Sequence, residues 1–235
     1  MDKRLASVTE AVSRIPDGAT VMIGGFGGSG APIELIHALV DHGAKGLTVV
    51  NNNAGNGHVG LAALIEQGQV DKLICSFPRG ANTEVFTERY RAGTIALELV
   101  PQGTLAERIR AGGSGIPAFY TPTSYGTDLA EGKPVAEFDG RMYVQERWLK
   151  ADFALIKANA ADPHGNLTYR MAARNFNPIM AMAANTTIVQ ATEVVGLGGI
   201  DPEQVITPGI FVDHVVEVPA PQQEEVLNRA EAVYP

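Results

Sequence analysis

The sequence predicts an α/β fold with a mainly parallel sheet covered by helices, and two observations carry this prediction. In the first half of the chain, short apolar segments of strand length alternate with amphipathic segments of helical spacing. Glycine or proline stands at most of the joints between these segments. Because strand–helix alternation brings successive strands into one sheet in the same direction, it favours a parallel sheet with helices on its faces.

The individual elements follow from periodicity and turn residues. The expected helices of the first half cover 5–14, 32–42, 59–67, 82–92 and 103–111, and the expected strands cover 20–24, 47–51, 72–77 and 95–100. The second half contains more strands, and its Asp139-Gly140 pair predicts a hairpin turn. Its expected strands cover 135–138, 141–144, 152–160, 166–169, 186–195 and 205–218, with a helix over 178–184 and a terminal helix within 219–235. We expect a single domain over residues 1–235.

Composition excludes several classes of function. The chain has 235 residues, of which 45% are hydrophobic and 19% charged, so it has enough apolar residues for an ample core. A net charge of −8 and the lack of any Lys/Arg cluster argue against nucleic acid or an acidic membrane as partner. Cys75 is the single cysteine, and no apolar segment has the length of a signal peptide or a membrane span, so we expect a cytoplasmic protein. The five histidines lack metal-ligand spacing, and no metal is expected.

A glycine-rich segment follows the first expected strand. Five glycines occur within residues 24–30, and Pro32 stands where the next helix should begin. Glycine allows positive φ angles and lets a ligand approach the backbone, and a helix N-terminus presents free amide groups that attract phosphate, carboxylate or an oxyanion. The candidate binding residues are therefore Gly24, Gly25, Phe26, Gly27, Gly28, Ser29 and Gly30.

Two other interpretations of this segment stay open at this point. Gly25, Gly27 and Gly30 also fit the G-x-G-x-x-G pattern of dinucleotide-binding folds. Such a fold needs an acidic residue at the end of the second strand. Residues 51–53 stand there in this chain and are all asparagines, so a nucleotide-dependent dehydrogenase is disfavoured. A tight turn without a ligand is the second alternative.

Further glycine- and proline-rich segments follow the other expected strands, at 51–57, 76–79, 101–104 and 112–123. Because the carboxyl ends of parallel strands meet at one edge of the sheet, we expect these segments to form one rim around a ligand, although each alone could be an ordinary turn. Asn53 and Arg79 are candidate binding residues on this rim. No nucleophile motif occurs, and Cys75 lies within an apolar strand as a small buried side chain.

Several of these segments resemble a known family. Residues 17–32, 101–110, 125–127 and 173–177 are similar to motifs of the α subunits of family I CoA-transferases. The segments 52–57, 75–79, 165–170 and 206–212 look most like the 3-oxoadipate branch, which passes CoA from succinyl-CoA to 3-oxoadipate. The resemblance implies coenzyme A as co-substrate and no permanently bound cofactor. It also implies that the partner is a β subunit, in an α₂β₂ assembly.

The resemblance further implies a division of chemical roles. In this family the nucleophile is the glutamate of a Ser-Glu-Asn-Gly motif on the β subunit, which forms a glutamyl-CoA thioester, and that motif does not occur in this sequence. Gln102 matches the family's oxyanion-hole glutamine, and an uncharged amide suits that work. The alternative is a surface glutamine that caps the helix over 103–111.

The same resemblance gives roles to the other candidates. Residues 24–30 would contact CoA or the acyl group, and Arg79 would hold the distal carboxylate of a dicarboxylic acid, unless it is an ordinary solvated arginine. Two functional alternatives remain: the α chain of an acetoacetate- or acetate-type CoA-transferase, and a non-catalytic sensor of a CoA ester or sugar phosphate.

Overall fold

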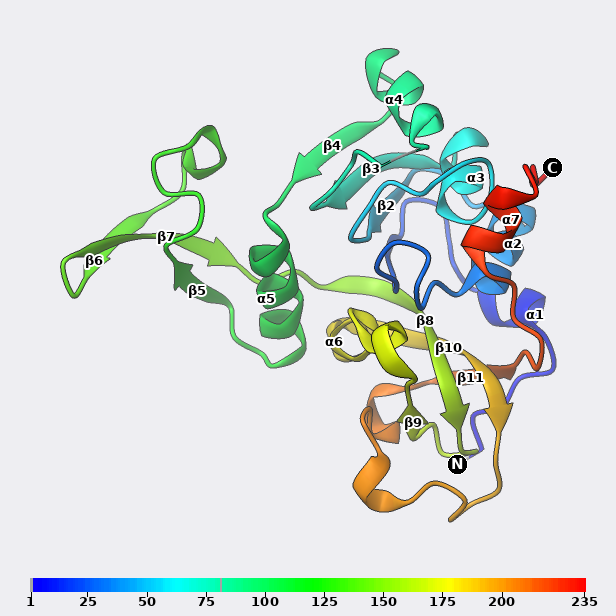
Figure 1. The fold of residues 1–235 in the computed structure, drawn as a ribbon. Coiled ribbons are helices and arrows are strands. Elements are labelled where there is room, and N and C mark those ends of the chain that lie inside the picture. Colours follow the sequence, from blue (N-terminus) through cyan, green and yellow to red (C-terminus); the bar gives the residue numbers. More distant parts are fainter. Residues whose placement is uncertain (1, 81) are drawn as a thin grey trace.

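The computed structural model describes residues 2–80 and 82–235 and contains a large, mainly parallel sheet (Figure 1). Seven strands form a path in the order β11-β10-β8-β1-β2-β3-β4, and every pair along it is parallel. The strands are β1 (Thr20–Ile23), β2 (Leu47–Val50), β3 (Val70–Cys75), β4 (Ala96–Leu99), β8 (Ala151–Ala161), β10 (Ala184–Val194) and β11 (His214–Glu217). The short β9 (Leu167–Thr168) pairs antiparallel with β8. The predicted fold class is confirmed.

Helices cover both faces of this sheet. One face carries α1 (Val8–Val12), α2 (Ile33–His42), α3 (Leu61–Glu66) and α4 (Glu84–Arg91), and the other carries α5 (Gln102–Gly113) and α6 (Asn177–Ala183). Side chains alternate between the two cores, so that Val21 and Ile23 join the first while Met22 joins the second. Strands buried on both faces explain the apolar segments that the sequence shows, and each helix contributes the apolar stripe that completes a core.

The order of strands reverses beside β1. From β1 the chain builds β2, β3 and β4 on one side, and it later adds β8, β10 and β11 on the other side. Ligands of open parallel sheets bind beyond the carboxyl ends of the strands at such a reversal. The glycine-rich segment 24–30 follows β1 directly and therefore lies at this position.

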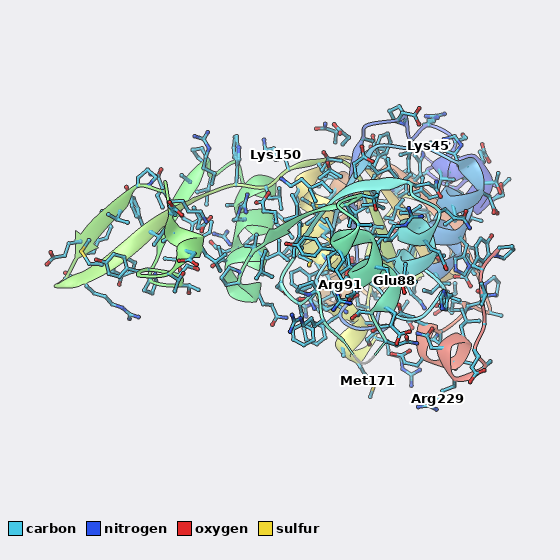
Figure 2. All side chains as sticks on the ribbon, turned by 90° about the horizontal axis from the view of Figure 1, so that it is seen from above. Lys45, Glu88, Arg91, Lys150, Met171 and Arg229 are labelled. Atoms are coloured by element: carbon cyan, nitrogen blue, oxygen red, sulfur yellow. The ribbon has the colours of Figure 1, made fainter. Side chains whose placement is uncertain are left out.

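A three-stranded antiparallel sheet extends away from the rest of the molecule, as Figures 1 and 2 show. Its strands are β5 (Ala118–Thr121), β6 (Val135–Phe138) and β7 (Arg141–Arg147), in the order β5-β7-β6. The predicted hairpin is confirmed, since Asp139 and Gly140 have φ angles of 52° and 75° at its turn. Aromatic rings on this sheet pack edge to face, Tyr120 with Phe138 at 5.2 Å and Phe138 with Tyr143 at 5.5 Å.

The structure corrects the expectation for residues 112–123. Gly112 and Gly113 end α5, and β5 follows, so this segment joins the antiparallel sheet and not the rim. The 12 residues of α5 separate it from the rim by about 18 Å, the length of such a helix. A glycine pair is typical of a loop, but close packing requires glycine in this helix, because a Cβ on Gly112 would lie 2.2 Å from the Leu149 carbonyl oxygen.

The predicted strand over 205–218 is also wrong in extent. Only β11 forms there, after two short 3₁₀ helices at Pro202–Gln204 and Gly209–Phe211. Pro208 has no N–H to donate to a strand, and Gly209 packs so closely on the His164 carbonyl that a Cβ would lie 2.2 Å from its oxygen. The remaining elements are 3₁₀ helices at Asp128–Ala130 and Met171–Arg174 and the terminal helix α7 (Glu224–Arg229), which confirms the helix predicted within 219–235. Within the described residues, no helix has the length and apolarity needed to cross a membrane.

Candidate functional site

The segments that follow β1, β2 and β3 meet the start of α5 at the carboxyl edge of the sheet. Between them lies a cavity of about 370 Å³, which we call the rim pocket. It is lined by Phe26, Gly27, Asn52, Asn53, Asn56, Phe77, Arg79, Gly80, Thr83 and Gln102. The rim pocket thus brings together five residues that the sequence singled out, namely Phe26, Gly27, Asn53, Arg79 and Gln102.

The glycine-rich segment forms a tight turn whose two ends are paired. The Phe26 N–H donates to the Ser29 carbonyl at 3.0 Å, and the Ser29 N–H donates back to Phe26 at 3.1 Å. Gly25 and Gly27 adopt backbone φ angles of 129° and 57°, which residues with a Cβ atom rarely adopt. The turn explains why Phe26 stands out from the chain with half of its surface exposed beside the pocket.

The glycines of this turn serve different contacts. A Cβ on Gly24 would lie 1.8 Å from Asn177 Oδ1, and one on Gly30 would lie 2.5 Å from the Ala173 carbonyl oxygen. Protein packing therefore requires glycine at both positions, whether or not a ligand binds. Ser29 and Gly30 face a second cavity of about 560 Å³, which Lys157 and Arg170 also line. Gly24, Gly25 and Gly28 line neither cavity.

The start of α2 is engaged by the protein itself. The helix begins at Ile33 after Pro32, as predicted to within one residue, but the Leu35 N–H donates to Gln190 Oε1 at 3.3 Å. Glu34 places a carboxylate in the first turn, and it accepts the Gln222 N–H at 2.6 Å. The expectation of free amide groups at this helix N-terminus is therefore wrong at Leu35, because the Gln190 side chain of β10 reaches it.

Three consecutive asparagines tie the strand ends together. Asn51 Nδ2 donates to the Ile23 carbonyl at 2.7 Å, and Asn53 Nδ2 donates to the Gly27 carbonyl at 3.4 Å. Asn52 lies between them, and its Oδ1 accepts one hydrogen bond from Ser76 Oγ and one from Gln102 Nε2, each at 2.8 Å. The sequence indicates Asn53 as a binding candidate and the three asparagines as evidence against a dinucleotide fold, but it does not single out Asn52. The residues of this region that were not predicted as candidates are Asn52, Asn56, Ser76 and Phe77.

Gln102 is the first residue of α5, and its side chain is exposed at the rim pocket. Within the part of the chain that the structure describes, no side-chain hydrogen bond caps this helix and the Gln102 amide donates to Asn52, so the alternative interpretation of Gln102 as a helix cap is wrong. Its amide instead donates to Asn52, and the second amide hydrogen remains for a ligand in the pocket. The geometry provides an uncharged donor held at a fixed point.

Charge at the rim pocket comes from Arg79. Its side chain is exposed, and no described carboxylate lies within 4.0 Å of its guanidinium. Cys75, one residue before Ser76, is buried, and burial raises the pKa of its thiol to about 12, which confirms that it is an inert core side chain. The described residues contain no group of three or more metal-ligating side chains.

A buried acid lies behind the glycine-rich turn. Glu224, at the start of α7, is 5% exposed, and Asn56 Nδ2 donates to its carboxyl at 3.4 Å. Burial, followed by the charge of Glu225, raises the pKa of Glu224 to about 7, although the Asn56 hydrogen bonds lower it. The terminal segment runs beside α2 and α3 (Figure 1), and Tyr234 stacks on His37 with ring centroids 3.8 Å apart. No local pattern in the sequence indicates this contact.

Comparison with known proteins decides the family. The profile of the Coenzyme A transferase family matches residues 5–218, which is most of the chain. The chain belongs to the Coenzyme A transferase family. The resemblance carried by the motifs at 17–32 and 101–110 is therefore confirmed.

Relatives within this CoA-transferase family match over nearly their whole length. The chain is 62% identical to the A subunit of 3-oxoadipate CoA-transferase from Acinetobacter baylyi over 218 residues, which is 93% of this chain and 96% of that protein. It is 50% identical to the A subunit of the probable succinyl-CoA:3-ketoacid coenzyme A transferase from Bacillus subtilis, over 97% of this chain and 95% of that protein. Among solved structures, a variant of the decarboxylase AibA/AibB superposes with a TM-score of 0.81 at 27% identity, over 98% of this chain and 93% of that one.

Proposed function

We propose that this chain is the A subunit of a 3-oxoacid CoA-transferase, and that 3-oxoadipate accepts CoA from succinyl-CoA. The single observation that carries the substrate is the similarity to the A subunit of 3-oxoadipate CoA-transferase, which reaches 62% identity over 96% of that protein. The succinyl-CoA:3-ketoacid relative from Bacillus subtilis is 50% identical. This difference favours the 3-oxoadipate branch over the acetoacetate-type alternative.

The rim pocket supports the transfer chemistry. Each step of CoA transfer through an acyl-glutamyl anhydride and a glutamyl thioester passes through a tetrahedral oxyanion, which needs fixed uncharged donors. Gln102 provides such a donor at the pocket wall, where Asn52 holds it at 2.8 Å. We therefore assign oxyanion stabilisation to Gln102.

The nucleophile is assigned to a partner protein. The described residues that line the rim pocket supply amide, aromatic and glycine groups, the Thr83 hydroxyl and one guanidinium, but no carboxylate. The relatives are named as A subunits, which is consistent with a B subunit that brings the glutamate of the Ser-Glu-Asn-Gly motif. We propose an α₂β₂ assembly in which the two kinds of chain close the rim pocket between them, with coenzyme A as a co-substrate.

The pocket also suggests how a dicarboxylic acid would be oriented. Arg79 is an exposed cation on the pocket wall, and Phe26 and Phe77 provide apolar surface next to it. A chain of a few methylene groups could lie on the aromatic rings while its distal carboxylate reaches the guanidinium. Arginine binds carboxylates with two parallel hydrogen bonds, so this arrangement would favour succinate and 3-oxoadipate over acetate.

The test is a CoA-transfer assay on the chain co-expressed with a B subunit that carries the Ser-Glu-Asn-Gly motif. The enzyme should transfer CoA from succinyl-CoA to 3-oxoadipate with a kcat/KM at least about tenfold above that for acetoacetate or acetate, the ratio expected for one additional charged hydrogen bond. Equal use of acetoacetate would instead favour the 3-ketoacid alternative. Binding of CoA esters without any transfer would favour the non-catalytic sensor.

A further inference from the structure

A hydrogen-bonded series of three side chains leads from β3 to the rim pocket. Ser76 Oγ, one residue beyond β3, donates to Asn52 Oδ1 at 2.8 Å and lies 3.1 Å from the Asn52 carbonyl oxygen. Gln102 Nε2 donates to the same Asn52 Oδ1 at 2.8 Å. Asn52 is 4% exposed, so the acceptor that joins the two donors is buried.

In the structure, the Asn52 amide directs its oxygen toward two donors. A carbonyl oxygen has two acceptor positions, and Ser76 and Gln102 occupy both on Asn52 Oδ1. Reversing the Asn52 amide alone would place its N–H groups against the Gln102 N–H, which cannot accept a hydrogen bond. In the structure, with Oδ1 facing Ser76 and Gln102, Asn52 Nδ2 lies on the other side of the amide. Among the described residues, the buried side-chain atoms without a hydrogen-bond partner are Gln69 Oε1 and Thr104 Oγ1, so Asn52 Nδ2 is not one of them. Asn52 also lines the rim pocket.

This orientation places two uncharged donors close together. Within an amide group the oxygen and nitrogen are about 2.2 Å apart, so Asn52 Nδ2 lies at most about 5 Å from Gln102 Nε2. One oxygen atom can accept from two donors at this separation, since each hydrogen bond spans about 2.9 Å. Two convergent donors are the arrangement that stabilises a tetrahedral oxyanion.

We propose that Asn52 is the second oxyanion donor of this site and that Ser76 is its positioning residue. Ser76 does not line the rim pocket; its hydroxyl acts through Asn52 by holding the amide with Nδ2 toward the pocket. The proposal rests on the proposed function of Gln102. It adds two residues to the site and predicts that they act as a unit.

The experiment is steady-state kinetics of CoA transfer by the chain in complex with the B subunit. Ser76→Ala should lower kcat about tenfold, the kinetic equivalent of one neutral hydrogen bond, with little change in KM. Asn52→Ala should lower kcat more, by about a hundredfold, as expected for an oxyanion donor. In the double variant, Ser76→Ala should cost nothing further, because Ser76 acts only through the Asn52 side chain.

Controls separate positioning from simple destabilisation. Ser13→Ala removes a hydroxyl hydrogen bond of 2.7 Å to the Glu10 carbonyl, outside the site, and should leave kcat unchanged. Ser76→Thr keeps the hydroxyl and should recover most of the lost kcat. If Asn52→Ala does not fold, Asn52→Asp keeps an acceptor for Ser76 and Gln102 but removes the donor, and it should still lose at least about a hundredfold in kcat.

The outcomes distinguish this proposal from that for Gln102. An unchanged kcat in Ser76→Ala, or an effect that persists in full when Asn52 is already alanine, would overturn the proposal while leaving the role of Gln102 intact. A Gln102→Ala variant with normal kcat would instead overturn the proposed function of Gln102. Loss of thermal stability in Ser76→Ala without loss of kcat would assign the hydroxyl a purely structural role and would also overturn the proposal.

Discussion

Replacing Gln102 with alanine tests the chemistry assigned to the rim pocket. The side chain is exposed, and its one hydrogen bond with the described residues is the 2.8 Å contact to Asn52 Oδ1. Asn52 Oδ1 keeps its hydrogen bond from Ser76 in the variant, so the free energy of unfolding should fall by at most about 1 kcal/mol. Loss of one oxyanion donor typically costs about 10²–10³ in kcat, or about 3–4 kcal/mol of transition-state stabilisation. The expected loss of activity is therefore much larger than the loss of stability.

The assay compares kcat and KM of the complex of both subunits with succinyl-CoA and 3-oxoadipate. We expect kcat and kcat/KM to fall together and KM to stay within a few-fold, since the donor acts on the transition state. Gln67→Ala is a matched control, because Gln67 is an exposed glutamine at the end of α3, away from the rim. A raised KM with an unchanged kcat would refute the reasoning and assign Gln102 to ground-state binding.

Three further predictions concern the pocket, the partner and the terminal helix. Arg79→Met should lower kcat/KM for dicarboxylic acids about 10- to 100-fold, the range for a lost hydrogen bond to a charged group, and leave acetate unaffected; equal losses for both would contradict this role. The purified chain alone should be folded by circular dichroism but transfer no CoA, and borohydride trapping of the two-subunit complex should label a glutamate of the partner; a label on this chain would contradict the division of roles. Glu224→Gln should raise the thermal stability at pH 8 and not at pH 4, because burial raises the pKa of Glu224 from 4.5 to about 7. In the wild-type chain, the ionised carboxylate therefore lowers the free energy of unfolding increasingly as the pH rises from 4.5 to 7, by about 3 kcal/mol above pH 7. Equal stabilisation at both pH values would show that the buried charge is not the cause.

Much of the main sheet could be predicted because its signals are local. β1, β2 and β3 are short apolar segments between turn residues, and each helix that follows them shows helical spacing within itself. Such patterns depend on neighbours a few residues away, so they can be recognised without knowing which strands pair with one another. The rim pocket followed from the same logic, since strands that run in parallel must end at one edge.

The features that were missed depend on contacts between distant parts of the chain. Residues 112–123 contain glycine and proline in a pattern typical of loops, but Ala118–Thr121 becomes a strand because β7, about twenty residues later, pairs with it. The contact of Glu224 with Asn56 joins residues 168 positions apart, and nothing in the short polar segment around Glu224 indicates that its carboxyl is buried. Tertiary packing overrides local preference at both places.

One signal for the site was nevertheless present in the sequence, because the alternation of side chains continues past the strand ends. Met22, Val50 and Ile74 all face the core that α5 and α6 complete. Counting two residues onward from each leads to Gly24, Asn52 and Ser76, which should face the same side. The structure agrees, since Gly24 packs on Asn177 of α6 while Ser76 and Asn52 hydrogen-bond toward Gln102 of α5. Of the three asparagines, the alternation alone therefore indicates Asn52 as the one beside Gln102. The same parity explains why glycine is required at position 24, where any side chain would enter the space that Asn177 occupies.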